Sequence, residues 1–160
     1  MKYSLLIVLM GIVAVGGCSK KGSADRVDYI DKDDPKMNAA IDKARSTVNT
    51  FISALAAPKP NQDNFSVKMA FTDGEHTEHM WLGSVRYDGK VFRGVVNNDP
   101  ELVKNVKLGQ KASIEPSKVS DWMFVENGKL IGGYTIRVMR DTMTKKEREE
   151  FDRSVPFSFD

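Results

Sequence analysis

The chain contains little cysteine and little histidine, and both shortages limit its chemistry. Its 160 residues include one cysteine, Cys18, and two histidines, His76 and His79. A single cysteine cannot form an intramolecular disulfide or a cysteine-based zinc site. The two histidines are three positions apart, so they point to opposite faces of a strand, and no third histidine exists to complete a zinc site. We therefore expect no metal and no cofactor.

The sequence also lacks an excess of charge of one sign and a long apolar run. It has 24 Lys and Arg against 22 Asp and Glu, whereas nucleic-acid binding requires concentrated cationic side chains. Nucleic acid is therefore not an expected partner. The apolar stretch from Leu5 to Val15 is shorter than the roughly 20 residues that a membrane-spanning helix requires.

The first residues resemble a bacterial lipoprotein signal. A basic start at Lys2 precedes the apolar stretch, and the small residues Gly16 and Gly17 stand directly before Cys18. An ordinary cleaved signal and a retained anchor are the alternatives. The resemblance predicts that residues 1–17 are removed and that Cys18 carries the lipid. Ser19, where an aspartate favours retention in the inner membrane, predicts an outer-membrane lipoprotein that faces the periplasm; the inner membrane is the alternative.

The remaining chain divides into a tether and one domain. Residues 18–34 are mostly small, polar or charged, which predicts a flexible tether after the lipid. Residues 35–160 have the size of a single globular domain that can bury a core without disulfides. Lys20 and Lys21 follow the lipid closely enough to contact anionic headgroups.

A helical pattern begins the domain. Asp34 followed by Pro35 is a typical helix start, because the carboxylate can accept from free amides and proline suits the first turn. Apolar residues then recur at helical spacing: Met37, Ala40, Ile41, Ala44, Val48, Phe51, Ile52 and Leu55. The pattern predicts one long N-terminal helix that ends at Ala57, before Pro58.

Strand patterns follow the helix. They lie at 65–72, 76–87, 90–97, 111–125, with an irregularity at Pro116, and 129–139. The pairs Asp73-Gly74, Asp88-Gly89 and Asn127-Gly128 predict tight hairpin turns between strands. We expect an α+β fold whose antiparallel, strongly bent sheet of about five strands is built from consecutive hairpins, with a partly closed small barrel as a variant. Residues 100–105 suggest one helical turn, and Thr144 with Glu147 predicts a short C-terminal helix.

The candidate binding residues lie in three short motifs. They are Glu78, His79, Trp81, Asp121, Trp122 and Arg137. On a strand, His79 and Trp81 share one face and Glu78 the other, and Arg137 could lie across the sheet from an acid such as Glu78 or Asp121. One interpretation is a binding patch, because Trp and Arg often anchor binding sites. The other is a structural ion pair with tryptophan in the core.

The same motifs resemble a known family. Glu78-His79-Met80-Trp81-Leu82, Asp121-Trp122-Met123 and Gly132-Gly133-Tyr134-Thr135-Ile136-Arg137-Val138 occur in the order found in domain of unknown function 2314, the YegJ-like bacterial proteins. The resemblance covers about residues 35–153. It implies one autonomous domain, and it carries no catalytic residue over to this chain.

Three functions are compatible with these observations. The first is a non-enzymatic, lipid-anchored module that binds an envelope protein or a small ligand. The second, by analogy with related small domains beside toxin genes, is an immunity or inhibitor protein against an envelope-acting toxin. The third is a hydrolase that uses Glu78 or Asp121 with His79, which requires these groups to share one accessible cavity.

Overall fold

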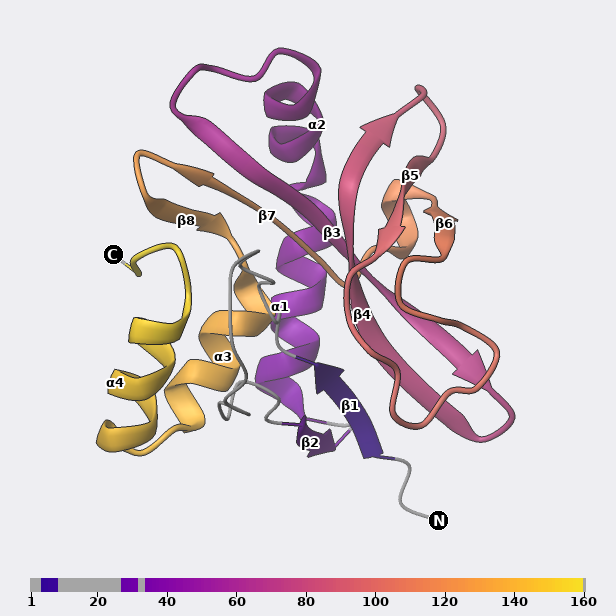
Figure 1. The fold of residues 1–160 in the computed structure, drawn as a ribbon, viewed down its shortest axis with the longest axis vertical. Coiled ribbons are helices and arrows are strands. Elements are labelled where there is room, and N and C mark those ends of the chain that lie inside the picture. Colours follow the sequence, from indigo (N-terminus) through magenta and orange to yellow (C-terminus); the bar gives the residue numbers. More distant parts are fainter. Residues whose placement is uncertain (1–3, 9–26, 32–33, 160) are drawn as a thin grey trace, which may run out of the picture.

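The computed structural model describes residues 4–8, 27–31 and 34–159, whose arrangement is shown in Figure 1. The strands are β1 (Ser4–Val8), β2 (Val27–Asp31), β3 (Gln62–Asp73), β4 (His76–Tyr87), β5 (Phe92–Val96), β6 (Lys111–Ile114), β7 (Asp121–Glu126) and β8 (Lys129–Gly132). The helices are α1 (Pro35–Ser46), α2 (Val48–Ala56), α3 (Tyr134–Thr142) and α4 (Lys145–Ser154), with a 3-10 turn at Pro116–Lys118. The α+β class is confirmed. Cys18, the predicted lipidation site, lies outside the described residues.

The strands form one open, strongly bent sheet. Its order is β2-β1-β4-β3-β7-β8, and β5 and β6 continue from β4. The domain supplies six strands that pair antiparallel, β3 to β8, whereas β1 pairs parallel with β4. Five strands and the barrel variant were therefore wrong expectations. The predicted strand at 111–125 divides into β6 and β7 because Pro116, which has no amide hydrogen, begins the 3-10 turn between them.

The three predicted hairpin turns are confirmed. β3 and β4 are joined through Gly74, with φ +59°, and β4 and β5 through Gly89, with φ +91°. Asn127 and Gly128 both have positive φ between β7 and β8. Residues 100–105 form no helix and instead make an irregular loop beside β4.

The predicted long N-terminal helix is interrupted at Thr47. Asp34 does cap its start, accepting from the Met37 amide at 2.8 Å. At Thr47 the hydroxyl donates to the Lys43 carbonyl at 2.7 Å, a bond that competes with regular helical bonding. The Ala44 carbonyl accepts from the Trp122 indole at 2.9 Å. The Thr47 amide divides its bonding between the Lys43 carbonyl at 3.1 Å and the Ala44 carbonyl at 3.3 Å, and the chain bends there into α2.

The predicted strand at 129–139 is a strand only at its start. β8 ends at Gly132, and Gly133, with φ +61°, begins α3. A side chain at Gly132 would place its Cβ 2.3 Å from the Trp122 carbonyl oxygen, so the chain turns here only because both positions are glycine. α4 begins at Lys145, and the preceding Thr144 forms the predicted capping box with Glu147.

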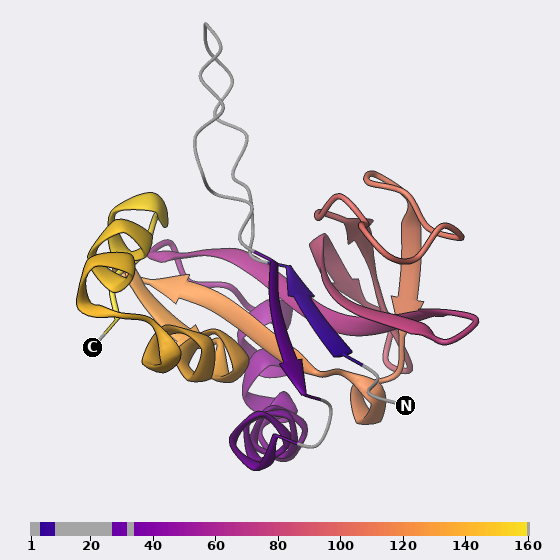
Figure 2. The same ribbon diagram turned by 90° about the horizontal axis from the view of Figure 1, so that it is seen from below.

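The sheet has an apolar core on each face. One core joins the sheet to α2 through Phe51, Val67, Met80, Leu82, Trp122 and Phe124. The other joins it to α3 and the C-terminal segment through Trp81, Met123, Val125, Leu130, Ile136 and Phe157. The view from below shows α3 and α4 far from β5 and β6, at opposite ends of the molecule (Figure 2). No helix within the described residues is long and apolar enough to cross a membrane.

Candidate functional site

A row of polar and aromatic residues crosses three strands beneath α3. Lys68 on β3 lies directly opposite Trp81 on β4 and opposite Asp121 on β7. All three side chains are buried, with at most 1% of their surface exposed. Directly opposed residues in antiparallel strands share a face, so this row lies on the side of the sheet that α3 covers.

Asp121 joins the row to the start of α3. Its Oδ1 accepts from the amides of Trp122 at 2.8 Å and Tyr134 at 3.2 Å. Its Oδ2 accepts from the amide of Thr135 at 2.8 Å and from the Thr135 hydroxyl at 2.6 Å. The first amides of a helix have no partners within it, and Gly133 has no side chain to cap them. Asp121 therefore serves as the cap of α3 from a neighbouring strand.

Lys68 completes a buried polar network. Its Nζ donates to the Thr135 hydroxyl at 3.3 Å and lies 5.2 Å from the ring centre of Trp81, a cation–π distance. Burial lowers the pKa of Lys68 to about 8, while the Asp121 carboxylate opposes that shift. Burial also raises the pKa of Asp121, against the bonds from Thr135 and the charge of Lys68. The network thus buries an amine and a carboxyl group together, with neither exposed to solvent.

His79 lies beside this network on the same face, as its spacing from Trp81 predicts. It is opposite Ala70 of β3 and is half-buried, whereas His76 is exposed at the start of β4. Burial, followed by the positive charges of Lys68 and Arg45, lowers the pKa of His79 to about 3. The imidazole is therefore neutral near pH 7. Among residues 4–8, 27–31 and 34–159, no three His, Cys, Asp or Glu side chains gather as a metal site.

Glu78 faces the other side of the sheet. It is fully buried, and its carboxylate accepts from the amides of Glu101 at 2.9 Å, Leu102 at 2.8 Å and Val103 at 2.7 Å. These bonds hold the loop after β5 against β4. Glu78 therefore lies on the opposite face from His79, whereas Asp121 shares the face of His79 but is fully buried and bonded to the start of α3. Neither carboxylate is exposed beside His79, as the hydrolase hypothesis requires.

The two tryptophans belong to the two cores. Trp122 packs with Phe51 on the α2 side, at a ring distance of 5.7 Å, and its indole donates to α1. Trp81 packs with Met123 under α3, and its amide donates to the Asn98 side chain at 2.6 Å. Neither indole is accessible, so neither forms part of an open aromatic patch.

Arg137 does not lie across the sheet from Glu78 or Asp121, as the sequence suggested. It is on α3, and its guanidinium donates to the carbonyls of Gly132 at 3.2 Å and Leu130 at 2.9 Å. The same guanidinium lies 5.8 Å from the ring of Phe159. Arg137 thereby joins β8, α3 and the C-terminal segment. The sequence expectation failed because it placed Arg137 on a strand.

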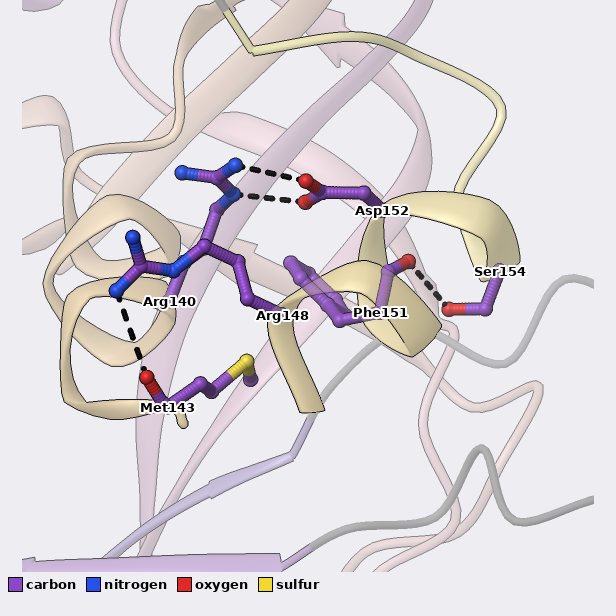
Figure 3. A network of polar contacts seen from close by, with 6 residues as sticks. All are labelled: Arg140, Met143, Arg148, Phe151, Asp152 and Ser154. Atoms are coloured by element: carbon purple, nitrogen blue, oxygen red, sulfur yellow. Dashed lines mark hydrogen bonds and ion pairs between the residues drawn. The ribbon is translucent and has the colours of Figure 1, made fainter. Parts of the chain in front are cut away.

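The contact between α3 and α4 depends on a second arginine. Arg140 binds Asp152 through two parallel bonds of 2.7 Å, as Figure 3 shows. Arg148 also reaches back from α4, to the Met143 carbonyl at 3.4 Å. The hydrogen bonds and charge of Arg140 keep the pKa of Asp152 below its ordinary value. α4 is thus attached to α3 by polar contacts on the surface.

Sequence reasoning missed Lys68 and Thr135. Lys68 alternates with the apolar residues of β3, a pattern typical of the solvent-facing side of a strand. It is buried because α3 covers that side of the sheet, whereas the sequence pattern predicts a strand, not a helix, over residues 134–139. The one signal for the helix was the Gly132-Gly133 pair, which interrupts a strand pattern and allows the chain to turn.

Comparison with known proteins identifies a bacterial group. Residues 34–159 match a family model described as "Uncharacterized protein conserved in bacteria (DUF2314)". The chain is 37% identical over 150 residues to the uncharacterised protein YegJ of Escherichia coli K12, covering 94% of this chain and 95% of that protein. It is 37% identical over 146 residues to a Neisseria meningitidis serogroup B protein named for ankyrin repeats, covering 82% of this chain and 55% of that relative. The match thus spans about half of the meningococcal protein. No solved structure matches the chain.

Proposed function

We propose, on the premise that this chain belongs to the DUF2314 family of bacterial proteins, that it is a lipid-anchored protein of the cell envelope whose domain acts by binding and catalyses no reaction. The anchor rests on the sequence before Cys18: a basic start, a short apolar stretch and two glycines. A lipid on Cys18 would keep the domain at a high effective concentration near partners at the membrane.

One observation carries the binding role: the acidic groups that sequence reasoning selected are fully used by the fold. Asp121 accepts from the start of α3, and Glu78 accepts from the loop after β5. General acid–base catalysis needs two titratable groups near one accessible substrate position. Here both carboxylates are fully buried, on opposite faces of the sheet, and neither is exposed beside His79. The arrangement supports a domain that acts through its surface.

The anchor is tested by labelling cells with radioactive palmitate. The wild-type protein should incorporate label and fractionate with the outer membrane, and a Cys18→Ser variant should remain unlabelled. Equal labelling of the two proteins would contradict the anchor. Label on a protein found only in the inner membrane would keep the anchor and overturn the outer-membrane assignment.

The binding role is tested by chemical crosslinking in intact cells, followed by mass spectrometry. The matched control carries residues 1–34 of this chain on an unrelated soluble domain, so it shares the anchor and the tether. We expect crosslinked partners or a co-purified ligand that the control lacks. Identical partner sets, with no ligand retained by the wild type, would argue against a binding domain.

A further inference from the structure

The outward face of β4, β5 and β6 contains a groove that none of the sequence motifs indicated. Its volume is about 540 Å³, and its polar lining consists of Ser84, Arg86, Arg93, Lys111 and Ser113. These five side chains are exposed and face away from the core that contains Phe92. β5 and β6, which contribute most of its lining, lie at the opposite end of the molecule from α4 (Figures 1 and 2).

Two arginines in the groove oppose each other directly. Arg86 on β4 pairs in register with Arg93 on β5, so their Cβ atoms start about 4.5–5.5 Å apart on the same face. Like charges at such positions destabilise a sheet. Lys111 on β6 pairs with Val95, two residues along β5 from Arg93, and adds a third cation diagonally. The fold gains nothing from concentrating these charges, which indicates a role outside the fold.

The three cations are only partly neutralised by the protein. Arg93 donates from its Nε to Asp88 at 3.0 Å, and its Nη2 is also 3.0 Å from that carboxylate. Arg86 and Lys111 have no ion-pair partner anywhere in the part of the chain that the structure describes. One carboxylate therefore faces three cations, and the groove keeps a net positive charge.

The backbone at the groove is strained. Ser84 has φ +51°, in the left-handed region, at the irregularity where the pairing of β4 and β5 shifts between Gly83 and Arg86. A non-glycine residue in such a conformation is strained, and such strain is often found at binding sites. Ser84, at this irregularity, lines the groove together with the arginines. Ser113 contributes a second hydroxyl from β6, opposite Arg93.

We propose that this groove binds a ligand through a phosphate group. A guanidinium can donate to two phosphate oxygens in parallel. The two positive charges of the facing arginines are balanced better by a phosphate group than by the single negative charge of a carboxylate. The serine hydroxyls donate to the remaining oxygens, and Lys111 binds as a point charge. The proposal rests on the binding role proposed above. The phosphate belongs either to a soluble ligand or to a lipid headgroup.

Isothermal titration calorimetry on the full chain, in neutral detergent and a phosphate-free buffer, tests this proposal with two soluble probes. Inorganic pyrophosphate represents a soluble ligand, and glycerophosphoglycerol, the headgroup of phosphatidylglycerol, represents a lipid. The double variant Arg86→Gln and Lys111→Gln removes the two unpartnered cations. A control, Lys36→Gln and Lys129→Gln, removes the same charge from exposed positions on α1 and β8.

We expect the wild type and the control to bind at least one probe, and the groove variant to bind it roughly tenfold more weakly or not at all. Selective binding of pyrophosphate identifies a soluble ligand, and selective binding of the headgroup identifies a lipid. Failure of the wild type to bind either probe overturns the proposal. Equal weakening in the groove variant and the control also overturns it, because the binding would then depend on total charge.

Phosphorus NMR of pyrophosphate after long incubation separates this proposal from the proposed function. Bound and intact pyrophosphate supports both. Consumption of pyrophosphate that depends on Arg86 would keep the groove as a phosphate site and overturn the non-enzymatic role. Absence of binding, together with domain-specific crosslinks in cells, would overturn the groove alone.

Discussion

Two polar regions of this domain use similar residues in opposite ways. Beneath α3, Lys68 and Asp121 are buried and bonded to each other through Thr135. On the outward face of β4 and β5, Arg86 and Arg93 are exposed and repel each other. In the first region the charged groups are buried in contacts with the protein itself, and in the second an exposed net positive charge remains. Charged residues therefore indicate a site here only where the fold does not use them itself.

Removing Asp121 should have the largest effect on the buried region. Asp121→Ala leaves the first amides of α3 without their acceptor and the buried Lys68 without its neighbouring carboxyl group, so we expect a loss of about 3–5 kcal/mol in the free energy of unfolding. Urea denaturation measures it, with Asp42→Ala on the exposed side of α1 as the control. Asp121→Asn, which keeps an acceptor oxygen, should lose less. Similar losses for Asp121→Ala and Asp42→Ala would refute the capping role.

A substitution at Gly132 tests whether the close-packed turn from β8 into α3, the helix that covers the buried region, stabilises the fold. Gly132→Ala places a Cβ 2.3 Å from the Trp122 carbonyl oxygen at a φ of +75°, and we expect a loss of about 2–4 kcal/mol. Gly89→Ala is the matched control, because Gly89 has φ +91° but no atom within 4 Å of the added Cβ. Thermal denaturation of the two variants is compared, and the control shows how much stability is lost through backbone strain alone. Equal losses in the two variants would exclude a packing role for Gly132.

Lys68 should make stability depend on pH. Its pKa is about 8 in the folded chain against 10.5 ordinarily, so between these values the unfolded chain holds a proton that the folded chain has released. The unfolding free energy of the wild type should therefore rise, relative to Lys68→Met, as pH increases from about 8 to 10.5. Denaturation of both proteins across this range measures the difference. A difference that stays constant with pH would show that Lys68 titrates normally.

Arg86 should show the smallest effect, with the opposite sign. Arg86→Gln removes the repulsion with Arg93 and breaks no bond within the described chain, so we expect a gain of about 0.2–1 kcal/mol. Arg93→Gln should gain less because it also loses Asp88. Both are compared by urea denaturation. A clear loss of stability in Arg86→Gln would mean that the groove is part of the structural framework.

Local signals in the sequence correctly predicted the parts of the fold that depend on neighbouring residues. Asp34 caps α1, Thr144 and Glu147 form a capping box, and Asn127-Gly128 turns between β7 and β8. The faces of β4 were also predictable, because alternation fixes which side chains lie together. Lys68 was beyond such reasoning, since its burial depends on a helix 67 residues away in the sequence.

The sequence by itself determined the element boundaries marked by caps and turns, the α+β class and the sharing of a face by His79 and Trp81. These depend on interactions over a few residues, which the order of amino acids specifies directly. Only the tertiary structure decided that Glu78 and Asp121 accept backbone amides on opposite faces of the sheet. It also decided that the Trp122 indole donates to the Ala44 carbonyl near the break between α1 and α2, and that Arg86 lies opposite Arg93. Each of these depends on strand register and on which helix covers which face, and those are set by packing among segments distant in the chain.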